Sequence, residues 1–255
     1  MAKAAIVTGG ARGIGRGCAL ALARRGFDVA IVDLLVPEME RTCGELEALG
    51  VRALPFEADV ADFRRAGEIG EAVFAALGRL DVLVNNAGKA QPKGITEITE
   101  EEFDRTLAIN LKSCFNYVRA SVPHMMAPVE GKKAGGRIVS MSSLNALSGG
   151  VTAAVSRFAY ASAKAGILGM TRALAKELGP NILVNAICPG LIKTELADKN
   201  HVIVERGAAL AREGIALGRV GSVEDVAEVV AFLATSEPCF ITGQEFVVDG
   251  FQYHV

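Results

Sequence analysis

The sequence predicts an α/β fold, a doubly wound parallel sheet of seven strands with helices on both faces, formed by a single domain over residues 1–255. Three observations predict it. Short runs rich in Val, Ile and Leu alternate with longer amphipathic stretches, which is typical of parallel strands joined by crossover helices. The short runs are almost continuously apolar, as strands covered on both faces are. A glycine-rich turn follows the first run, where such sheets bind phosphate groups.

The strands and helices are expected from these periodicities. The expected strands are Ala4–Thr8, Asp28–Asp33, Arg52–Glu57, Val82–Asn85, Arg137–Met141, Leu183–Ile187 and Glu245–Val248. The expected helices are Ile14–Arg25, Glu38–Leu49, Asp62–Leu77, Glu100–Met126, Phe158–Leu178 and Glu224–Ala234. Pro128–Gly136 is expected to be a surface loop. Residues 190–218 are less regular, and we expect a substrate-binding flap there.

Composition excludes several classes of protein. Lys and Arg number 27 against 29 Asp and Glu, a net charge of −2, and nucleic-acid binders usually carry a basic surplus. Although mean hydropathy is positive, no apolar run approaches the roughly 18 residues that span a bilayer. We therefore expect no nucleic-acid partner, no membrane association and a cytoplasmic location. The five cysteines and three histidines lack disulfide or metal spacing, so no metal site is expected.

The turn after the first strand reads Thr8-Gly9-Gly10-Ala11-Arg12-Gly13-Ile14-Gly15 and opens a helix. Glycines in this context permit a tight turn and let the backbone approach a pyrophosphate at the helix N-terminus. Arg16 and Gly17 follow where a Walker phosphate loop requires Lys and Ser or Thr, which excludes that motif. The alternative is a glycine-rich turn that binds nothing.

Asp33, at the end of the second expected strand, indicates which dinucleotide is bound. A carboxylate there accepts hydrogen bonds from the adenosine ribose diol and repels a 2′-phosphate, which favours NAD over NADP. Arg12 opposes this, because a cation in the turn could bind the 2′-phosphate. We give Asp33 more weight because its repulsion is direct. The alternative is a solvated acid at a strand end.

Further motifs follow in order: Asp59-Val60, Asn85-Asn86-Ala87-Gly88, Asn110, Ser142-Ser143, Tyr160-x-x-x-Lys164 and Pro189-Gly190-x-Ile192-x-Thr194. Together with the glycine-rich turn, they resemble the short-chain dehydrogenase/reductase family over nearly the whole chain, Thr8 to Asp249. The resemblance implies a Rossmann-like NAD(P)-binding catalytic domain. Within the family, the sequence is similar to 3-oxoacyl-(acyl carrier protein) reductases and to sugar or polyol dehydrogenases.

The resemblance also implies roles for the matched positions. Asp59 and Val60 would contact adenine, and Ile192 and Thr194 would lie near the nicotinamide carboxamide. The full set expected to bind the cofactor is Gly9, Arg12, Gly13, Ile14, Gly15, Asp33, Asp59, Val60, Asn86, Ala87, Gly88, Tyr160, Lys164, Pro189, Gly190, Ile192 and Thr194. The catalytic residues it implies are Asn110, Ser143, Tyr160 and Lys164.

Elementary chemistry agrees with those catalytic roles. Tyr160 and Lys164 are four residues apart on one expected helix and so share a face. A phenol is a weak base at neutral pH because its reference pKa is about 10, but a neighbouring ammonium and an oxidised nicotinamide both favour the phenolate. Tyr160 could then exchange a proton with an alcohol or carbonyl oxygen that Ser143 also binds. Asn110 would hold a water that passes protons on through Lys164.

Two features depart from the family pattern. The segment between Ser143 and Tyr160 is longer than usual, with the extra residues within Leu147–Arg157, so we expect a reshaped substrate pocket. The Val-Asp-Gly-Gly of many members is here Val248-Asp249-Gly250-Phe251, and Phe251 is expected at a subunit contact or near a neighbouring site.

The leading functional hypothesis is an oxidoreductase that transfers a hydride between NAD(H) and a secondary alcohol or ketone. The first alternative is a 3-oxoacyl-(acyl carrier protein) reductase, an activity that commonly uses NADPH, which Asp33 disfavours; a sugar or polyol dehydrogenase fits Asp33 better. A remote alternative is a regulator that senses NAD without turnover. The resemblance also implies a homotetramer, with Glu100–Met126 and Phe158–Leu178 at one interface.

Overall fold

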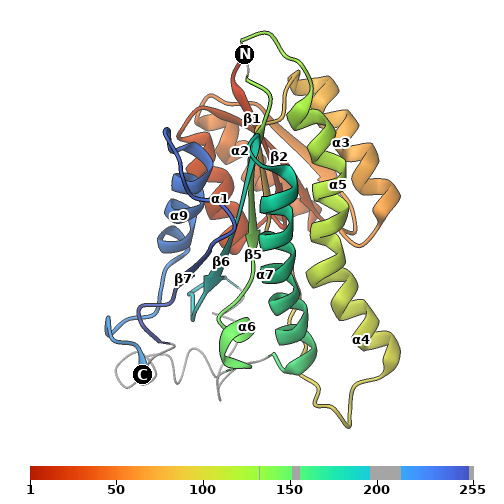
Figure 1. Cartoon of the computed structure of the whole chain (residues 1–255), viewed down its shortest axis with the longest axis vertical. Coiled ribbons are helices and arrows are strands. Elements are labelled where there is room, and N and C mark those ends of the chain that lie inside the picture. The colour runs from red at the N-terminus through yellow and green to blue at the C-terminus, as the bar shows by residue number, and fades with distance from the viewer. Residues whose placement is uncertain (132, 151–155, 196–213, 253–255) are drawn as a thin grey trace.

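Seven parallel strands form the centre of the molecule (Figure 1). The computed structural model describes residues 1–131, 133–150, 156–195 and 214–252. The strands lie in the order β3-β2-β1-β4-β5-β6-β7, so the sheet grows outward in both directions from β1 and β4. The strands are β1 Lys3–Thr8, β2 Phe27–Asp33, β3 Ala53–Glu57, β4 Val82–Asn85, β5 Gly136–Met141, β6 Ile182–Pro189 and β7 Glu245–Val248.

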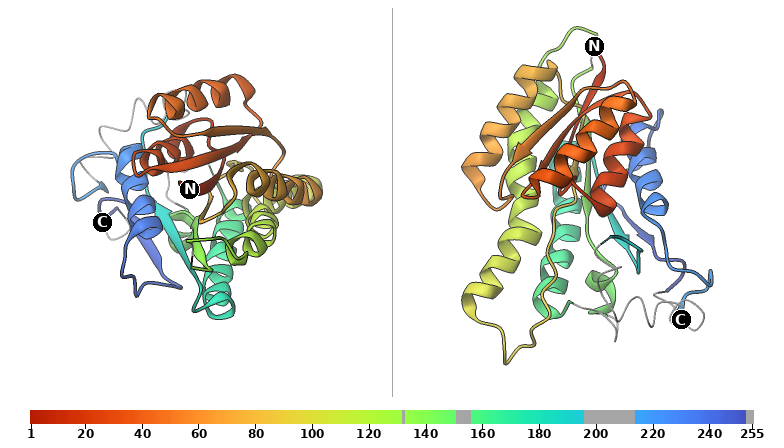
Figure 2. Two further views of the ribbon diagram at one scale, coloured as in Figure 1. Left: turned by 90° about the horizontal axis from the view of Figure 1, so that it is seen from above. Right: turned by 180° about the vertical axis from the view of Figure 1, so that it is seen from behind.

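Helices cover both faces of this sheet (Figure 2). They are α1 Gly13–Ala23, α2 Val36–Ala48, α3 Phe63–Leu77, α4 Glu100–Leu107, α5 Ser113–Met126, α6 Asn145–Ser148, α7 Phe158–Leu178 and α9 Val223–Thr235. Successive side chains of a strand point to opposite faces. Val7 of β1 accordingly packs with α1, α2 and α9, whereas Ile6 packs with α3, α5 and α7. The predicted fold class is confirmed.

The two edge strands differ from the expectation of burial on both faces. β1 and β4 are buried almost throughout, but β3 and β7 consist mainly of half-buried and exposed residues. An edge strand has a neighbour on one side only, so part of its surface remains open to solvent within this chain. Apolar composition predicted these strands without predicting their place at the edges.

The helix expected over Glu100–Met126 is interrupted. A π-helical turn, Ala108–Lys112, separates α4 from α5. Asn110 lies inside it and is fully buried, and its side-chain amide donates to the Thr106 carbonyl oxygen at 3.0 Å. π turns within α-helices occur frequently at functional sites, and this one includes a predicted catalytic residue.

His124, near the end of α5, is a buried helix residue rather than a solvated one. It is only 8% exposed, and its ring stacks on Phe74 with the ring centroids 4.8 Å apart. The reason is tertiary: α5 packs along α3, and His124 lies on the face between them.

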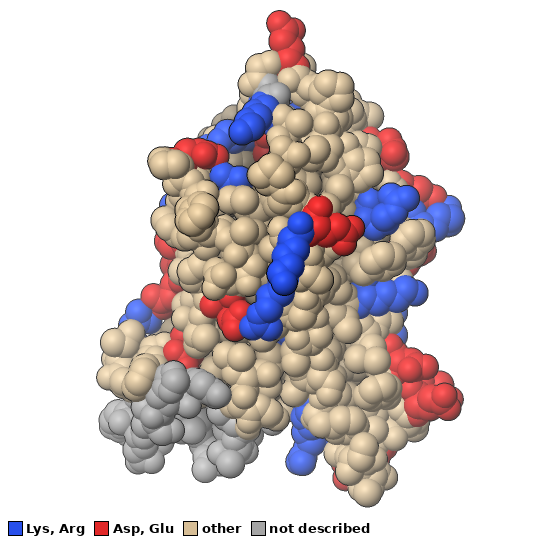
Figure 3. Space-filling view, viewed as in Figure 1, with Lys and Arg blue, Asp and Glu red and all other residues tan. Residues whose placement is uncertain are grey.

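The described residues contain no helix long and apolar enough to cross a bilayer. Within the same ranges, no three His, Cys, Asp or Glu side chains converge as metal ligands. On the face shown in Figure 3, acidic and basic side chains are interspersed, without a continuous basic stripe.

Candidate active site

The predicted site residues gather at one edge of the sheet. Gly9, Asp33 and Asp59 follow the carboxyl ends of β1, β2 and β3, while Asn86 and Ser143 follow those of β4 and β5. All strands are parallel, so these ends lie on the same side of the molecule. Ligands of open α/β sheets bind at this edge, where the strand order reverses.

The glycine-rich turn is shaped for a group that approaches its backbone. Gly9 and Gly13 have φ angles of +63° and +56°, which side chains disfavour. A Cβ at Gly15 would collide with the Gly9 carbonyl oxygen, so the helix can begin this close to the turn only with glycine. Arg12, at the helix N-cap, makes no side-chain cap. No side chain of the turn therefore caps the first N–H groups of α1, and a helix N-terminus of this kind can bind an anion.

Asn86 holds the turn in place. Its Nδ2 donates to the carbonyl oxygens of Thr8 and Gly9, each at 3.0 Å. The Thr8 hydroxyl in turn accepts the N–H groups of Asn86 and Ala87 at 3.0 and 3.1 Å. These bonds connect the ends of β1 and β4. The turn is thus fixed by hydrogen bonds from the neighbouring strand end.

The Asp33 carboxylate lies directly beside the turn. Oδ2 accepts the Ala11 N–H at 3.1 Å, and Oδ1 accepts the N–H groups of Leu34 and Leu35 at 2.8 and 3.2 Å. Three backbone donors therefore orient one carboxylate. Leu34 is 57% exposed, so the residue after the strand offers an apolar surface and no cation.

Asp59 is held from two sides. Its Oδ1 accepts the Ala61 N–H at 2.9 Å, and its Oδ2 accepts Arg105 Nη2 at 2.6 Å. Burial by itself raises the pKa of the Asp59 carboxyl, but these two hydrogen bonds and the charge of Arg105 outweigh it and hold the pKa below its usual value. Asp59 is therefore an oriented anion at neutral pH. Its neighbour Val60 is buried.

Lys164 and Asn110 meet around Gly88. A Cβ built on Gly88 would lie 2.9 Å from Asn110 Oδ1 and 3.3 Å from Lys164 Nζ. Lys164 is 3% exposed, and its Nζ donates to the Met141 carbonyl oxygen at 2.7 Å. The same Nζ lies 5.7 Å from the centroid of the half-buried Tyr160 ring. The structure thus brings three of the four predicted catalytic residues together.

The two neighbouring serines differ in environment. Ser142 is buried, and its hydroxyl donates to the Lys164 carbonyl oxygen at 2.8 Å. Ser143 is half-buried, and its Oγ accepts the Asn145 N–H at 3.2 Å. The Ser142 hydroxyl already donates its proton to a buried backbone carbonyl, whereas the Ser143 hydroxyl accepts a hydrogen bond and can still donate its proton. This difference favours Ser143 as the catalytic serine.

The segment after β6 crosses back to the glycine-rich turn. Thr194 carbons lie 3.7 Å from the place where a Gly13 Cβ would stand, and Glu195 Oε2 accepts the Gly13 N–H at 3.3 Å. Ile192 pairs with Gly221 in an isolated bridge. Of the flap expected at residues 190–218, residues 196–213 lie outside the described part, as do residues 151–155 of the long loop before Tyr160.

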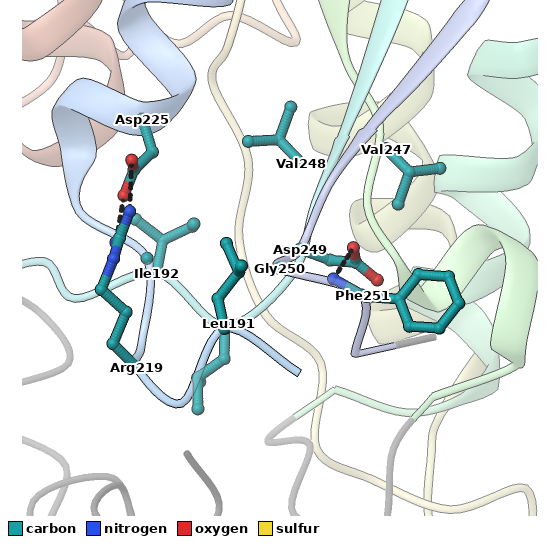
Figure 4. Close-up of a pocket in the computed structure, with 11 residues that line it drawn as sticks. Leu191, Ile192, Arg219, Asp225, Val247, Val248, Asp249, Gly250 and Phe251 are labelled. Carbon is teal, nitrogen blue, oxygen red and sulfur yellow. Dashed lines mark hydrogen bonds and ion pairs between the residues drawn. The ribbon is translucent and has the colours of Figure 1, made fainter. Parts of the chain in front are cut away.

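A pocket of about 430 Å³ borders this segment (Figure 4). Phe251 lines it with a φ of +70° and is 56% exposed. Its ring points away from the Arg219–Asp225 ion pair, which joins Nη1 and Oδ2 at 2.6 Å. The other lining residues are largely apolar: Leu191, Ile192, Leu217, Val247 and Val248.

Sequence reasoning missed Arg105, Glu195 and Asn116. Each contacts a residue of the predicted site, but only through the fold: Arg105 and Asp59 are 46 positions apart, and Gly13 and Glu195 are 182 apart. Asn116 donates to the Val60 carbonyl oxygen at 3.0 Å. Arg105 lies close to Asn110 in sequence, which is the one signal that could have drawn attention to it.

Comparison with known proteins agrees with this geometry. Residues 9–250 match a family model described as enoyl-(acyl carrier protein) reductase. The chain is 37% identical to 3-oxoacyl-(acyl-carrier-protein) reductase FabG of Thermotoga maritima, over 97% of this chain and 96% of the relative. Two solved structures, each 34% identical and each covering 98% of this chain, also match it. A putative short-chain alcohol dehydrogenase from Sinorhizobium meliloti, covered over 96% of its length, has a TM-score of 0.88. A blue fluorescent protein from a metagenomic library, solved with NADPH and covered over 97%, has a TM-score of 0.85.

Proposed function

The chain belongs to the short-chain dehydrogenase/reductase family and is an oxidoreductase, and from this premise we propose that it transfers a hydride between NAD(H) and a secondary alcohol or its ketone. The observation that carries the proposal is the meeting of Lys164 and Asn110 around Gly88, with Tyr160 one helical turn before Lys164 on α7. The whole chain, 1–255, acts as one nucleotide-binding catalytic domain in this proposal.

The proposed chemistry places a proton at Tyr160 Oη. A bound nicotinamide supplies the hydride donor or acceptor. Tyr160 accepts the hydroxyl proton of the alcohol as the carbonyl forms, and returns it to the carbonyl oxygen in the reverse direction. Ser143 donates to the same oxygen and orients it. Catalytic proton transfer of this kind contributes about 10²- to 10⁴-fold to the rate.

Lys164 and Asn110 support that proton transfer. Lys164 Nζ donates one of its three N–H groups to the Met141 carbonyl oxygen. The other two N–H groups would be available to Tyr160 and to the ribose of a bound cofactor. This Nζ lies 5.7 Å from the centroid of the Tyr160 ring. Asn110 is tied to the Lys89 backbone by two hydrogen bonds, of 2.9 and 3.0 Å, and it fixes the π turn beside Lys164. We place a proton-relaying water there.

NAD is the proposed cofactor because of Asp33. Its carboxylate is oriented by three backbone N–H groups and so stands ready to accept the ribose hydroxyls. A 2′-phosphate would bring a second negative charge against it, and the following residues, Leu34 and Leu35, offer no cation in compensation. The binding residues proposed for the rest of the dinucleotide are those predicted from the sequence.

A 3-oxoacyl-(acyl carrier protein) reductase using NADPH is the second candidate. Specific observations favour it: a FabG relative matches nearly the whole chain, and one structural neighbour was solved with NADPH. Arg12 could bind a 2′-phosphate from the turn. The two candidates therefore differ in whether Asp33 or Arg12 decides the cofactor.

A regulator that senses NAD without turnover is the third candidate. It requires the dinucleotide site but has no use for Ser143, Tyr160 and Lys164. Tyr160→Phe separates it from an enzyme, because the variant would keep the output of a sensor while an enzyme would lose turnover.

The proposal extends to assembly and compartment. The Phe63 and Phe115 rings, 49% and 47% exposed, stack with centroids 5.7 Å apart, and Phe115 lies on α5. This exposed aromatic pair supports a homotetramer with α4, α5 and α7 at an interface, which light scattering would test. All five cysteines are free thiols, which supports the reducing cytoplasm as the compartment.

The direct test is a panel of steady-state assays. Sugars, polyols, hydroxysteroids and 3-oxoacyl thioesters are each tested with NAD(H) and NADP(H). The proposal expects turnover of a secondary alcohol or ketone with NAD(H) preferred. Turnover confined to 3-oxoacyl thioesters with NADPH would establish the second candidate instead.

A further inference from the structure

The helical segment that carries Asn110 also reaches the turn after β3. Arg105, near the end of α4, donates to Asp59 Oδ2 at 2.6 Å. Asn116 of α5, which is 1% exposed, donates to the Val60 carbonyl oxygen at 3.0 Å. Two residues of the α4–π–α5 segment therefore hold this turn, one before and one after Asn110 in sequence. Arg105 bonds a side chain of the turn, and Asn116 bonds its backbone.

The turn that it holds begins at the proposed ribose anchor. The Ala58 N–H donates to the Asp33 carbonyl oxygen at 3.1 Å, and β2 and β3 are adjacent strands. Residues Ala58–Asp62 would therefore be the turn next to a base whose ribose is held at Asp33. Of the two carboxylates of this turn, Asp62 caps α3 by accepting the Arg65 N–H at 2.9 Å, which leaves Asp59 to accept a hydrogen bond from the exocyclic amino group of adenine.

Arg105 itself lies at the border of a hollow. A pocket of about 490 Å³ is lined by Lys89, Gln91, Arg105, Thr106 and Ile109, among others. Lys89 is the backbone partner of Asn110. Arg105 therefore bonds Asp59 and also lines a hollow that includes Lys89, the backbone partner of Asn110.

Folding stability does not explain this ion pair. The side chains of Arg105 and Asp59 are 47% and 37% exposed, and exposed ion pairs contribute little to stability. Arg105 instead fixes the orientation of the Asp59 carboxylate. With Oδ1 held by the Ala61 N–H and Oδ2 by Arg105, the carboxylate cannot rotate, and its remaining lone pairs point in a constant direction.

We propose that Arg105 is a positioning residue for the adenine half of the dinucleotide, which it serves by orienting the Asp59 carboxylate. This inference rests on the proposed function, because it assigns Arg105 to the same cofactor site. Arg105 touches neither the nicotinamide nor the reacting atoms in this scheme, so it acts on affinity for adenosine-containing ligands and leaves the chemical step alone.

Calorimetric titration with two probes tests the inference. NAD⁺ contains adenine, whereas nicotinamide mononucleotide lacks the adenosine half. For Arg105→Met we expect the Kd for NAD⁺ to rise about fivefold, the size expected for one oriented ionic contact, and the Kd for the mononucleotide to stay within error. Arg105→Lys keeps the positive charge and should retain most of the NAD⁺ affinity of the wild-type protein.

Two further variants complete the design. Lys93→Met breaks the Lys93–Glu102 ion pair, of 2.5 Å, which also reaches α4, and leaves both Kd values unchanged. Asp59→Asn weakens NAD⁺ binding as Arg105→Met does, and the double variant is no weaker than Asp59→Asn alone. If Arg105→Met folds poorly, Arg105→Gln, a second variant without the charge, is combined with Asp59→Asn to measure the same non-additivity.

The contrary outcomes are distinct. An unchanged NAD⁺ Kd in Arg105→Met, or an equal loss for both probes, overturns the positioning role while the proposed oxidoreductase function stands. A wild-type protein that binds neither NAD⁺ nor NADP⁺ overturns both.

Discussion

The glycine-rich turn and the segment after β6 border the same site, but they are held differently. The turn is fixed by side chains that bond its backbone: Asn86 holds Thr8 and Gly9, and Asp33 holds Ala11. The described part of the later segment is held chiefly by backbone bonds between Leu191, Lys193 and Gly221. The first region presents backbone N–H groups and the second presents side chains.

This difference distinguishes phosphate binding, which the members of a family share, from substrate binding, which varies between members. A phosphate is the same in every dinucleotide, so a fixed turn with backbone donors suits all members of a family. Substrates differ, and loops carried on a rigid scaffold accommodate that variety. Changes at the turn should therefore abolish cofactor binding, whereas changes at the later segment should adjust it. Five substitutions, one of them a control, test this comparison, beginning with the proposed catalytic residue Tyr160.

Tyr160→Phe should have the largest effect on turnover. The change removes the hydroxyl that exchanges the proton but keeps the ring, so kcat should fall about 10³-fold while NAD⁺ affinity changes little. Steady-state kinetics and calorimetry measure the two quantities. Wild-type turnover by the variant would contradict the mechanism.

Gly15→Ala should nearly abolish dinucleotide binding. A Cβ at Gly15 would collide with the Gly9 carbonyl oxygen and with Asn86 Nδ2, so the turn must open and its N–H groups lose their alignment. We expect a loss of affinity of about 100-fold, equivalent to roughly 2.7 kcal/mol.

Gly44→Ala is the matched control for that substitution. Gly44 is an exposed glycine inside α2, and a Cβ there would meet nothing within 4 Å. Binding should be unchanged, and the free energy of unfolding should rise by about 0.5–1 kcal/mol, the helix preference of Ala over Gly. Equal effects of the two substitutions on binding would remove the argument for a shaped turn.

Asp33→Asn should change the cofactor preference with less effect on total binding. Loss of the charge weakens the bonds to the ribose hydroxyls and removes the repulsion against a 2′-phosphate. We expect NAD⁺ affinity to fall about tenfold, the scale of one charged hydrogen bond, and NADP⁺ affinity to rise. Titration with both dinucleotides measures the change; an unaltered ratio of the two affinities would assign cofactor choice elsewhere.

Glu195→Gln should have the smallest effect, and in the opposite direction. The Glu195 carboxylate accepts the Gly13 N–H at the start of α1, where a dinucleotide phosphate is proposed to bind. Removing this negative charge should raise NAD⁺ affinity about twofold at low salt, and less at high salt because exposed charges are screened. Titration at two ionic strengths tests it, and weaker binding by the variant would show that Glu195 supports the site.

The contrast between the two regions also describes what the sequence could predict. The turn and Asp33 were predictable because both are features of the local sequence: glycines for backbone shape and an acid at a strand end. The choice of Ser143 over Ser142 came from the family pattern, and their different hydrogen bonds agree with it.

Features that depend on packing were not predictable in this way. Asn110 of the π turn is tied by two hydrogen bonds to Lys89, a residue of the loop after β4. His124 is buried because α5 packs on α3, and hydrophobic periodicity does not identify a buried histidine. The Arg105–Asp59 pair joins residues 46 positions apart, for which a single sequence gives no signal.

The central claim is hydride transfer with NAD(H) as the preferred cofactor, and the most direct test is the ratio of kcat/KM for NAD(H) to that for NADP(H) on one turned-over alcohol or ketone. The absorbance of the reduced nicotinamide gives both rates in the same assay. The account predicts a ratio of at least about 10, the discrimination of one charged hydrogen bond. A ratio below 1 would contradict it.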